Sequence, residues 1–449
     1  PSISEGDVST EATMWVAGIF LLASVVFAKH EIYEGHAVYQ VSVKDVAQVK
    51  QLNEISGEVN ADIWSHAVPG HPGQILVSRE LKDLFEEALR TAGLDYTIEV
   101  DNVKTLLDLE DQMLAEAASK SPNRTRTSGL DLDRIYTYEE VDAYLEELAA
   151  AYPDVVTLVQ GGRSFEGRPI KYLKISTTNF EDRTKPVVFM ESLIHAREWV
   201  TLPVTLYAIE KLVIDVQEQD LVQDIDWIIL PIANPDGYVF THGANRFWRK
   251  NRATGYMIND ICVGVDLNRN FDINWSSHSS NIVCSEIFHG RAPYSEPETI
   301  VIRDIIREHI DRIELFLDIH SFGSMILYGF GTGILPPNGL ILHLVGVQMA
   351  TAIDAVKMSW NPNYIVGNVA MVLYEASGSA QDYAQGVGVP LSYTYELPGH
   401  RFGSGTAAGF LVDPNFIEQA GFETWEGIKA GARFARNNFR RKNGLDAQL

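Results

Sequence analysis

In the first quarter of the chain, short runs of alternating hydrophobic and polar residues are interleaved with runs of helical spacing. A period of two predicts strands, and apolar residues three and four positions apart predict helices. The predicted strands are 37–43, 74–77 and 96–100, and the predicted helices are 46–55, 81–92 and 105–119. The stretch from Lys29 to about Leu109 is therefore expected to be a small α+β domain, an open sandwich of four strands, three of which the pattern locates, and the two helices 46–55 and 81–92.

Beyond residue 129 the two kinds of pattern alternate over a much longer stretch. Helices are predicted at 138–152, 199–213 and 296–309, and strands at 170–175, 187–190, 227–232, 315–319 and 391–397. This alternation predicts an α/β domain with a largely buried sheet. Functional residues of such domains gather in loops at the ends of strands.

Residues 120–129 separate the two patterns and contain proline, glycine, serine and basic residues. This composition is typical of an exposed linker, where proteases cut folded proteins. Arg124 and Arg126 would suit a trypsin-like enzyme. An ordinary interdomain linker has the same composition, so composition alone leaves both interpretations open.

Residues 14–28 form an apolar run that ends before Lys29. A run of this kind near the start of a chain is typical of a secretory signal, here with a cleavage site at Val26-Phe-Ala28, and it is too short to span a bilayer comfortably. A buried strand or an anchor is the alternative. Residues 1–13 precede the first methionine and carry no recognisable signal.

Export changes the expectation for the cysteines, because exported proteins fold in oxidising compartments. Cys262 and Cys284 are the only two in the chain, so a disulfide between them is expected. The sequons Asn123-Arg-Thr and Asn274-Trp-Ser are then candidate glycosylation sites.

Composition excludes one class of partner. The chain has 449 residues, of which 46% are hydrophobic and 21% are charged, an ordinary balance for a globular protein. Lysine and arginine number 36 against 60 aspartates and glutamates, so the net charge is −24. An acidic chain of this size binds polyanions poorly, and no nucleic-acid partner is expected.

Two histidines stand at ends of predicted strands. The motif His195-Ala-Arg-Glu198 lies between the strand 187–190 and the helix 199–213. A histidine and a glutamate at this spacing can turn toward one point and form part of a zinc site. Alone the motif is weak, since such pairs are usually solvated. His320 follows the strand 315–319, and together the two sets favour a metal site with a position open for water.

Further candidates lie in later loops. The stretches 245–252 and 262–270 hold arginines and asparagines, and arginine can bind a carboxylate through two hydrogen bonds. Surface arginines are usually only solvated, so neither loop is decisive. Tyr374 lies in a loop rich in glycine and serine. Glu396 lies within an apolar strand, where a carboxylate is costly unless it is paired or functional.

The order of these motifs resembles the zinc metallocarboxypeptidases of the pancreatic A/B type. The motifs are His195-Ala-Arg-Glu198, Arg246-Phe-Trp-Arg249, Asp266-Leu-Asn-Arg-Asn270, Ile319-His-Ser321, Tyr374-Glu-Ala-Ser-Gly378 and Tyr395-Glu-Leu397. The resemblance covers nearly all of residues 29–439 and includes the cysteine spacing. It implies an α/β catalytic domain with a central mixed eight-stranded sheet flanked by helices, preceded by an inhibitory α+β pro-domain.

The resemblance also implies a division of the chain and a mode of activation. Residues 14–28 would be the signal peptide, 29–126 the pro-domain with its connecting segment, and 127–449 the catalytic domain. The linker would then be the activation site, with cleavage at Arg124 or Arg126 by a trypsin-like protease. The product would be a secreted monomer without a membrane span that acts on peptides with a free C-terminal carboxylate. Protein carboxypeptidase inhibitors would be further partners.

Individual residues take on roles by the same resemblance. His195, Glu198 and His320 correspond to the ligands of one zinc ion, the His₂Glu set known from carboxypeptidase A, with water in the fourth position. Glu396 corresponds to the general base and Arg249 to the residue that stabilises the oxyanion.

Other matches concern the substrate and the surroundings of the metal. Three residues correspond to those that hold the terminal carboxylate: Asn268, Arg269 and Tyr374. Two correspond to contacts in outer subsites: Arg197 and Arg246. Asp266 would orient His195. Phe322 stands where pancreatic members usually have tyrosine.

Gln381 decides the expected substrate preference. In the family this position lies at the base of the pocket for the C-terminal side chain, and it is apolar in A-type and aspartate in B-type enzymes. A neutral amide cannot counter the charge of lysine or arginine. Gly331 and Val369 match other pocket positions and add no charge. Aromatic, aliphatic and polar neutral residues are therefore expected, with a B-type or glutamate preference as the alternative.

Two other classes of protein share parts of this pattern. A catalytically inactive peptide-binding relative is disfavoured because every expected catalytic position is filled. A cytosolic or processing carboxypeptidase without a pro-domain is disfavoured by the apolar run at 14–28 and by the long N-terminal region.

Overall fold

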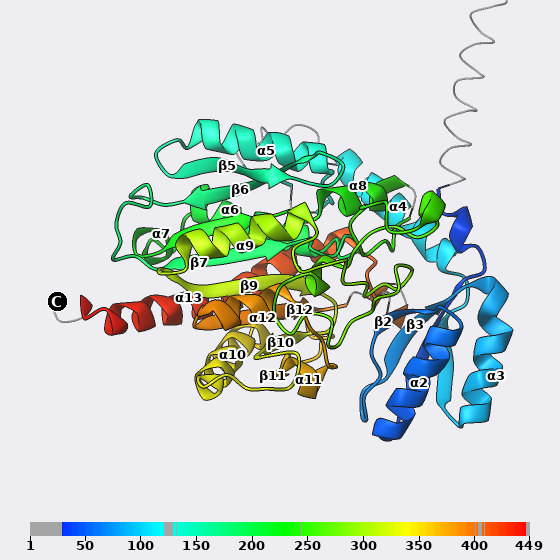
Figure 1. Cartoon of the computed structure of the whole chain (residues 1–449). Helices are drawn as coiled ribbons and strands as arrows, with labels where there is room; N and C mark the ends of the chain where they lie inside the picture. Colours follow the sequence, from blue (N-terminus) through cyan, green and yellow to red (C-terminus); the bar gives the residue numbers. More distant parts are fainter. Residues whose placement is uncertain are drawn as a thin grey trace, which may run out of the picture.

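A computed structural model describes residues 29–120, 129–131, 133–243, 245–399, 401–402, 406–407 and 409–445. The predicted signal segment 14–28 and the linker residues Asn123, Arg124 and Arg126 lie outside these residues. Figure 1 shows a small N-terminal domain, in blue, beside a larger domain that contains most of the chain.

The small domain is an open sandwich, as predicted. Its sheet has the order β2-β3-β1-β4, and all pairs are antiparallel. The strands are β1 (Ala37–Ser42), β2 (Asp62–Ser65), β3 (Gly73–Val77) and β4 (Asp95–Val100). The helices are α2 (Val46–Glu58), α3 (Lys82–Ala92) and α4 (Val103–Lys120), of which α4 leads toward the larger domain.

Both faces of the small sheet are buried, against different partners. Tyr39 points to one face and packs in a core with Phe85 of α3. Its neighbour Val38 points to the opposite face, as the pleat requires, and belongs to a cluster with Phe247 and Phe410 of the larger domain. The small domain is therefore held to the larger one by the second face of its own sheet.

The larger domain is built on a mixed eight-stranded sheet of the order β11-β10-β12-β9-β7-β8-β6-β5. The strands are β5 (Val156–Arg163), β6 (Pro169–Ile175), β7 (Val187–Ser192), β8 (Asp226–Leu230), β9 (Ile313–Ser321), β10 (Met325–Tyr328), β11 (Ile365–Asn368) and β12 (Leu391–Leu397). The central strands β12, β9, β7 and β8 are parallel. The eight-stranded sheet implied by the resemblance is confirmed.

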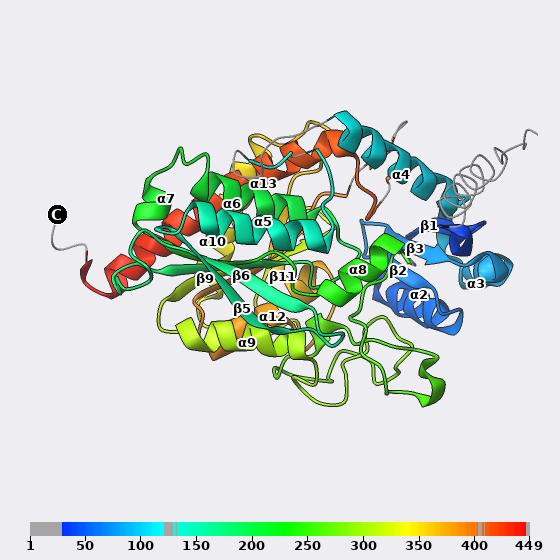
Figure 2. The same ribbon diagram turned by 90° about the horizontal axis from the view of Figure 1, so that it is seen from above.

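Helices cover both faces of this sheet (Figure 2). One face packs against α5 (Tyr138–Ala151), α6 (Thr201–Val213), α10 (Gly339–Asp354) and α13 (Pro414–Lys442). The other packs against α9 (Pro297–His309) and α12 (Ala380–Val387). Shorter elements are α7 (Asp220–Gln223), α8 (Pro235–Gly243), α11 (Val369–Val372), β13 (Arg401–Phe402) and β14 (Thr406–Ala407).

The predicted disulfide is present between Cys262 and Cys284. It closes a long loop of the larger domain, and such a closure stabilises a fold mainly by restricting the unfolded chain. Among the described residues, no helix has the length and apolar character needed to cross a membrane.

Candidate active site

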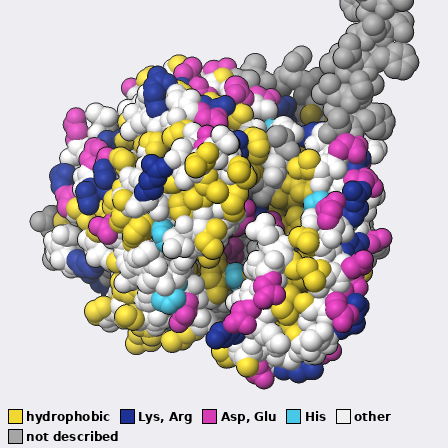
Figure 3. Space-filling view, turned by 45° about the vertical axis from the view of Figure 1, so that its right-hand side comes forward, with side chains coloured by type: hydrophobic (Ala, Val, Ile, Leu, Met, Phe, Trp, Pro, Cys, Tyr) yellow, Lys and Arg dark blue, Asp and Glu magenta, His cyan; other side chains and the backbone are white. Residues whose placement is uncertain are grey.

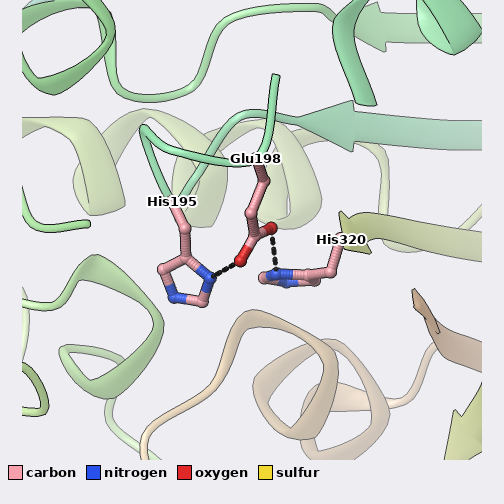
Figure 4. A group of neighbouring side chains, drawn as sticks. All are labelled: His195, Glu198 and His320. Carbon is pink, nitrogen blue, oxygen red and sulfur yellow. Dashed lines mark hydrogen bonds and ion pairs between the residues drawn. The ribbon is translucent and has the colours of Figure 1, made fainter. Parts of the chain in front are cut away.

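Three ionisable side chains meet at the C-terminal ends of the central strands. His195 follows β7 by a short loop, Glu198 lies just before α6, and His320 lies on β9. The Nδ1 atom of His195 is 2.8 Å from one oxygen of Glu198, and the Nδ1 atom of His320 is 3.0 Å from the other. Figure 4 shows the three side chains pointing toward one another.

This group has the chemistry of a metal site. All three side chains are buried, and one ligand atom from each lies within 4.8 Å of the other two. Two imidazoles and a carboxylate form a donor set that zinc prefers, and three protein ligands leave a fourth position for water. Among the described residues, no other group of His, Cys, Asp and Glu is arranged in this way.

Hydrogen bonds to its backbone hold the loop that carries His195. The amide of Ala196 donates to the carbonyl of Arg249 over 3.1 Å. The buried Asn234 side chain donates from Nδ2 to the carbonyls of Ile194 and Lys250, at 3.3 and 3.1 Å. The loop therefore presents His195 in a fixed place, although it is not a regular element.

Neighbouring charges shift the pKa values of Glu198 and His320 in opposite directions. Burial by itself would raise the pKa of Glu198, but His195 and His320 lower it well below its usual range. Burial would lower the pKa of His320, but Asp318 and Glu198 raise it well above its usual value. Because both histidines favour the ionised form of Glu198, the carboxylate stays available to a cation.

Asp266 contacts His195, as predicted. Its Oδ1 lies 3.1 Å from His195 Nε2, and its Oδ2 accepts from Nε and Nη2 of Arg249 at 3.1 and 2.9 Å. Burial opposes its charge, but Arg249 and His195 lower its pKa well below the usual value. One carboxylate therefore joins the histidine and the arginine.

Glu396 lies beside His320 on the neighbouring strand. The two residues are register partners in the parallel pair β12 and β9, so both side chains lie on the same face of the sheet. Burial within the cleft raises the pKa of Glu396 to about 8, against the opposing effect of His320. Its carboxyl is therefore positioned next to the metal group without being one of its three members.

Arg269 and Tyr374, far apart in sequence, are brought together at the site. Nη2 of Arg269 donates to the Tyr374 hydroxyl at 3.0 Å, while its buried Nε has no hydrogen-bond partner among the described residues. Asn268 is differently placed: its Oδ1 accepts from the amide of Ala380, and its Nδ2 donates to Asp318 Oδ2 at 3.2 Å. In this conformation, the Asn268 amide is directed into the protein.

Two carboxylates of the small domain form ion pairs with the two arginines that the resemblance assigns to outer subsites. Asp62 Oδ2 accepts from Arg197 Nη1 at 2.6 Å. Glu110 accepts from Arg246 through two bonds of 2.8 and 3.1 Å, and both side chains are only 1% exposed. The ring of His66 lies over that of Tyr374, with 4.1 Å between the ring centroids.

The metal group, Glu396, Arg249, Arg269 and Tyr374 open onto one cleft of about 1700 Å³, lined by residues of both domains. Figure 3 shows the molecular surface hollowed between the two domains. The pocket residues Gly331, Val369 and Gln381 line the same cleft. Phe322 also lines it and packs edge to face against Phe410, at 5.0 Å between ring centroids. The structure thus brings the metal group, Glu396, Arg269 and Gln381 to one space.

Two buried acids near the metal group were not predicted. Asp318 lies two residues before His320 on β9, and Glu191 is its register partner on β7. Both are fully buried. The signal was the one that singled out Glu396, an acid within an apolar strand, and it could have been applied to both.

Comparisons with known proteins agree with this geometry. A family model described as zinc carboxypeptidase matches residues 141–427, and one described as carboxypeptidase activation peptide matches residues 39–110. A protein of Helicoverpa zea called carboxypeptidase B is 47% identical over 427 residues, which are 94% of this chain and 99% of that protein.

Solved structures give the same result. The crystal structure of carboxypeptidase A from Helicoverpa armigera is 64% identical, with a TM-score of 0.89 over 91% of this chain and 99% of that one. Bovine thrombin-activatable fibrinolysis inhibitor, solved in complex with a tick carboxypeptidase inhibitor, is 29% identical with a TM-score of 0.62, over 68% of this chain and 99% of that one. The chain therefore belongs to the zinc carboxypeptidases and carries the activation peptide of their zymogens.

Proposed function

We propose that this zymogen is secreted and, once activated, releases single neutral residues from the C-termini of peptides. The observation that carries this proposal is the cleft, where the metal group meets Glu396 and the pair Arg269 and Tyr374. A preference for basic residues is the second candidate, favoured by the relative called carboxypeptidase B. The neutral side chain of Gln381 opposes it.

We assign the zinc ion to His195, Glu198 and His320. When bound, zinc supplies a Lewis acid that polarises the scissile carbonyl and increases the acidity of water. Glu396 takes a proton from the attacking water and passes it to the leaving amine. A nearby dication favours the ionised form of Glu396, and a base whose pKa is raised toward neutrality both accepts and returns a proton readily.

Two arginines complete the proposed reaction. Asp266 holds Nε and Nη2 of Arg249, which leaves Nη1 to stabilise the negative charge on the carbonyl oxygen. Arg269 holds the terminal carboxylate of the substrate through its unpaired Nε–H and its neighbouring N–H groups, together with the Tyr374 hydroxyl. This restricts cleavage to the last peptide bond. Asn268 joins them if its amide turns toward the cleft.

The pro-domain is proposed to inhibit by occupying the outer part of the cleft. Asp62 and Glu110 hold Arg197 and Arg246, which would otherwise contact the substrate chain. His66 covers Tyr374. A trypsin-like protease that cuts the linker is the proposed activator. Protein inhibitors that enter the exposed cleft are proposed partners of the activated form.

Removing one of these pro-domain contacts should raise the activity of the uncleaved chain. In Asp62→Ala, Arg197 loses a charged partner, and a hydrogen bond between charged groups contributes about 1.5–3 kcal/mol. We expect the uncleaved variant to hydrolyse a peptide substrate roughly tenfold faster than the parent, measured before any protease is added.

A matched control is available in the same domain. Asp95→Ala removes an exposed ion pair with Lys44, whose side chains are 72% and 68% exposed, away from the cleft. Its basal rate should equal that of the parent, because exposed pairs contribute little. Equal basal rates for Asp62→Ala and the parent would refute the inhibitory role of Asp62.

Activation should depend on the linker arginines. The double variant Arg124→Gln, Arg126→Gln should resist activation by trypsin, because trypsin cuts after basic residues and the linker beyond Lys120 offers these two. Activity after timed exposure to trypsin, with the size of the product on a gel, is the measurement. If the double variant activates at the parent's rate, activation occurs elsewhere in the chain.

The proposed function as a whole is tested with the trypsin-treated protein. Peptides that differ in their last residue should lose single C-terminal residues, and a zinc chelator should abolish the release. Internal cleavage, or release that the chelator leaves unchanged, would contradict the proposal.

A further inference from the structure

We infer that Asp318 is a positioning residue for the zinc ligand His320, in the way that Asp266 serves His195. This inference rests on the proposed ligand set. It gives each histidine a carboxylate near the ring nitrogen that does not face Glu198, whereas the sequence predicts this role for Asp266 alone.

The first support is the position of Asp318 behind the ring. Its Oδ1 lies 2.8 Å from His320 Nε2, in an ion-pair contact between two side chains that are 0% and 2% exposed. The two residues are two positions apart on β9, so their side chains lie on the same face of the sheet. On the other side of the ring, Nδ1 faces Glu198.

The second support is the inventory of donors and acceptors around the ring. If Nδ1 binds a metal through its lone pair, the proton of a neutral imidazole is on Nε2, which can then only donate. Two side-chain atoms lie near Nε2: Asp318 Oδ1 at 2.8 Å and Asn268 Nδ2 at 3.0 Å. An amide nitrogen cannot accept, and Asp318 Oδ1 is buried without a hydrogen-bond partner among the described residues as the ring now lies, so we assign the Asp318 carboxylate as the acceptor.

Asp318 is itself held in place. Its second oxygen, Oδ2, accepts from Asn268 Nδ2 at 3.2 Å, and Asn268 Oδ1 in turn accepts from the amide of Ala380 at 2.8 Å. The chain of contacts from α12 to His320 therefore fixes the carboxylate that faces the ring. This arrangement parallels the one at His195, where Asp266 is fixed by Arg249.

Glu191 is the second buried acid at this place in the sheet. It is the register partner of Asp318, and both of its oxygens are buried without a hydrogen-bond partner among the described residues. Burial and the charge of Asp318 raise its pKa well above the usual value, so Glu191 stays neutral. A neutral Glu191 places no second negative charge beside the contact between Asp318 and His320, so it is a buried acid with which the role of Asp318 can be compared.

A carboxylate that accepts from a metal-ligating histidine fixes the ring orientation and makes the ligand more basic, and its loss typically lowers metal affinity about 10- to 100-fold. The test is the affinity of the full-length chain for Zn²⁺, measured by competition with a chelator. We expect such a loss in Asp318→Asn, which keeps the size of the side chain. Asp318→Ser, a smaller neutral side chain, should show a similar loss. Thermal unfolding of the metal-free variants serves as the check on folding.

A spectroscopic readout separates positioning from general stability. With Co²⁺ in place of zinc, the visible absorption bands report the ligand geometry, and they should shift in Asp318→Asn. Glu191→Gln is the matched control, because Glu191 is a neighbouring buried acid without a hydrogen bond to either histidine among the described residues, and its zinc affinity and cobalt spectrum should match those of the parent.

The outcomes are distinct. If the parent binds no zinc, the proposed ligand set fails. If the parent binds zinc and both Asp318 variants bind it equally well, with unchanged cobalt spectra, Asp318 has no positioning role. Equal losses in Glu191→Gln and Asp318→Asn would show a general effect of disturbing the buried acids, and would also overturn the inference.

Discussion

Replacing Glu396 by glutamine should reduce kcat by about 10²–10⁴-fold, the contribution usual for a general base. The amide has the size of the carboxyl group but cannot take a proton from water. The three metal ligands are other residues, so the zinc content should stay at one ion per chain. Because the interaction acts only during the chemical step, kcat and kcat/KM should fall together.

The control for this variant is a second glutamate that lines the same cleft. Glu375 is 63% exposed and pairs with His278 at 3.3 Å, away from the metal group. Glu375→Gln should retain turnover close to that of the parent. A Glu396→Gln protein that loses its zinc, or one that keeps full turnover with zinc bound, would remove Glu396 from the role of base.

Buried parallel strands were the easiest part of this fold to predict. Such strands are apolar on both faces and appear as continuous hydrophobic runs, which is why β7, β9 and β12 were located within about two residues. The four-residue strands β2, β10 and β11 were missed. Four residues are too few to show a period, and these strands form because distant partners already offer hydrogen bonds.

The long helix α13 was missed for another reason. Its glycines argue against a helix on propensity alone. In the structure they allow close packing: a Cβ at Gly427 would lie 2.7 Å from the Ile353 side chain, and one at Gly431 would lie 2.5 Å from the sulfur of Met349. Contact with α10 therefore outweighs the local preference.

The candidate site also combines residues that a local motif identifies with contacts that no local motif predicts. The order of short motifs was sufficient to locate the metal group and to single out Glu396 as the proposed base, because each motif is local. The contacts of Asp62 with Arg197 and of Glu110 with Arg246 join residues 135 and 136 positions apart. No local pattern indicates which acid will meet which arginine, and these pairs follow only from the docking of the two domains.

The proposed substrate preference rests on the position of Gln381 relative to Glu396. Ser392, Thr394 and Glu396 alternate along β12, so all three lie on one face of the strand. Gln381 Nε2 donates to the carbonyl of Ser392 at 3.4 Å. Four residues of strand span roughly 13 Å, so the Gln381 amide lies well below the proposed base, where the far end of a C-terminal side chain would reach.

The Gln381 amide, which lies at this depth in the proposed pocket, carries no charge. Gln381 is fully buried, and its Oε1 has no partner among the described residues, while its Nε2 is already bonded. A lysine or arginine side chain would leave water without meeting a counter-charge, and glutamate would meet an occupied donor. We expect kcat/KM for C-terminal Phe, Leu and Gln to exceed that for Lys and Arg on the order of 100-fold, since an unpaired buried charge costs about 3 kcal/mol or more.

The matching variant is Gln381→Asp, compared with the parent in one peptide series ending in Phe, Leu, Gln, Glu, Lys or Arg. An aspartate at this position gives a basic side chain its missing partner, so the ratio of kcat/KM for Arg to that for Phe should rise on the order of 100-fold. Gln381→Asn, which keeps the amide, should leave the order of substrates unchanged. If the parent cleaves Arg or Lys faster than Phe or Leu, the neutral preference is wrong. If Gln381→Asp gains nothing on basic substrates, the side chain at position 381 does not contact the C-terminal residue, because a carboxylate within reach of a buried cation could not leave its binding unchanged.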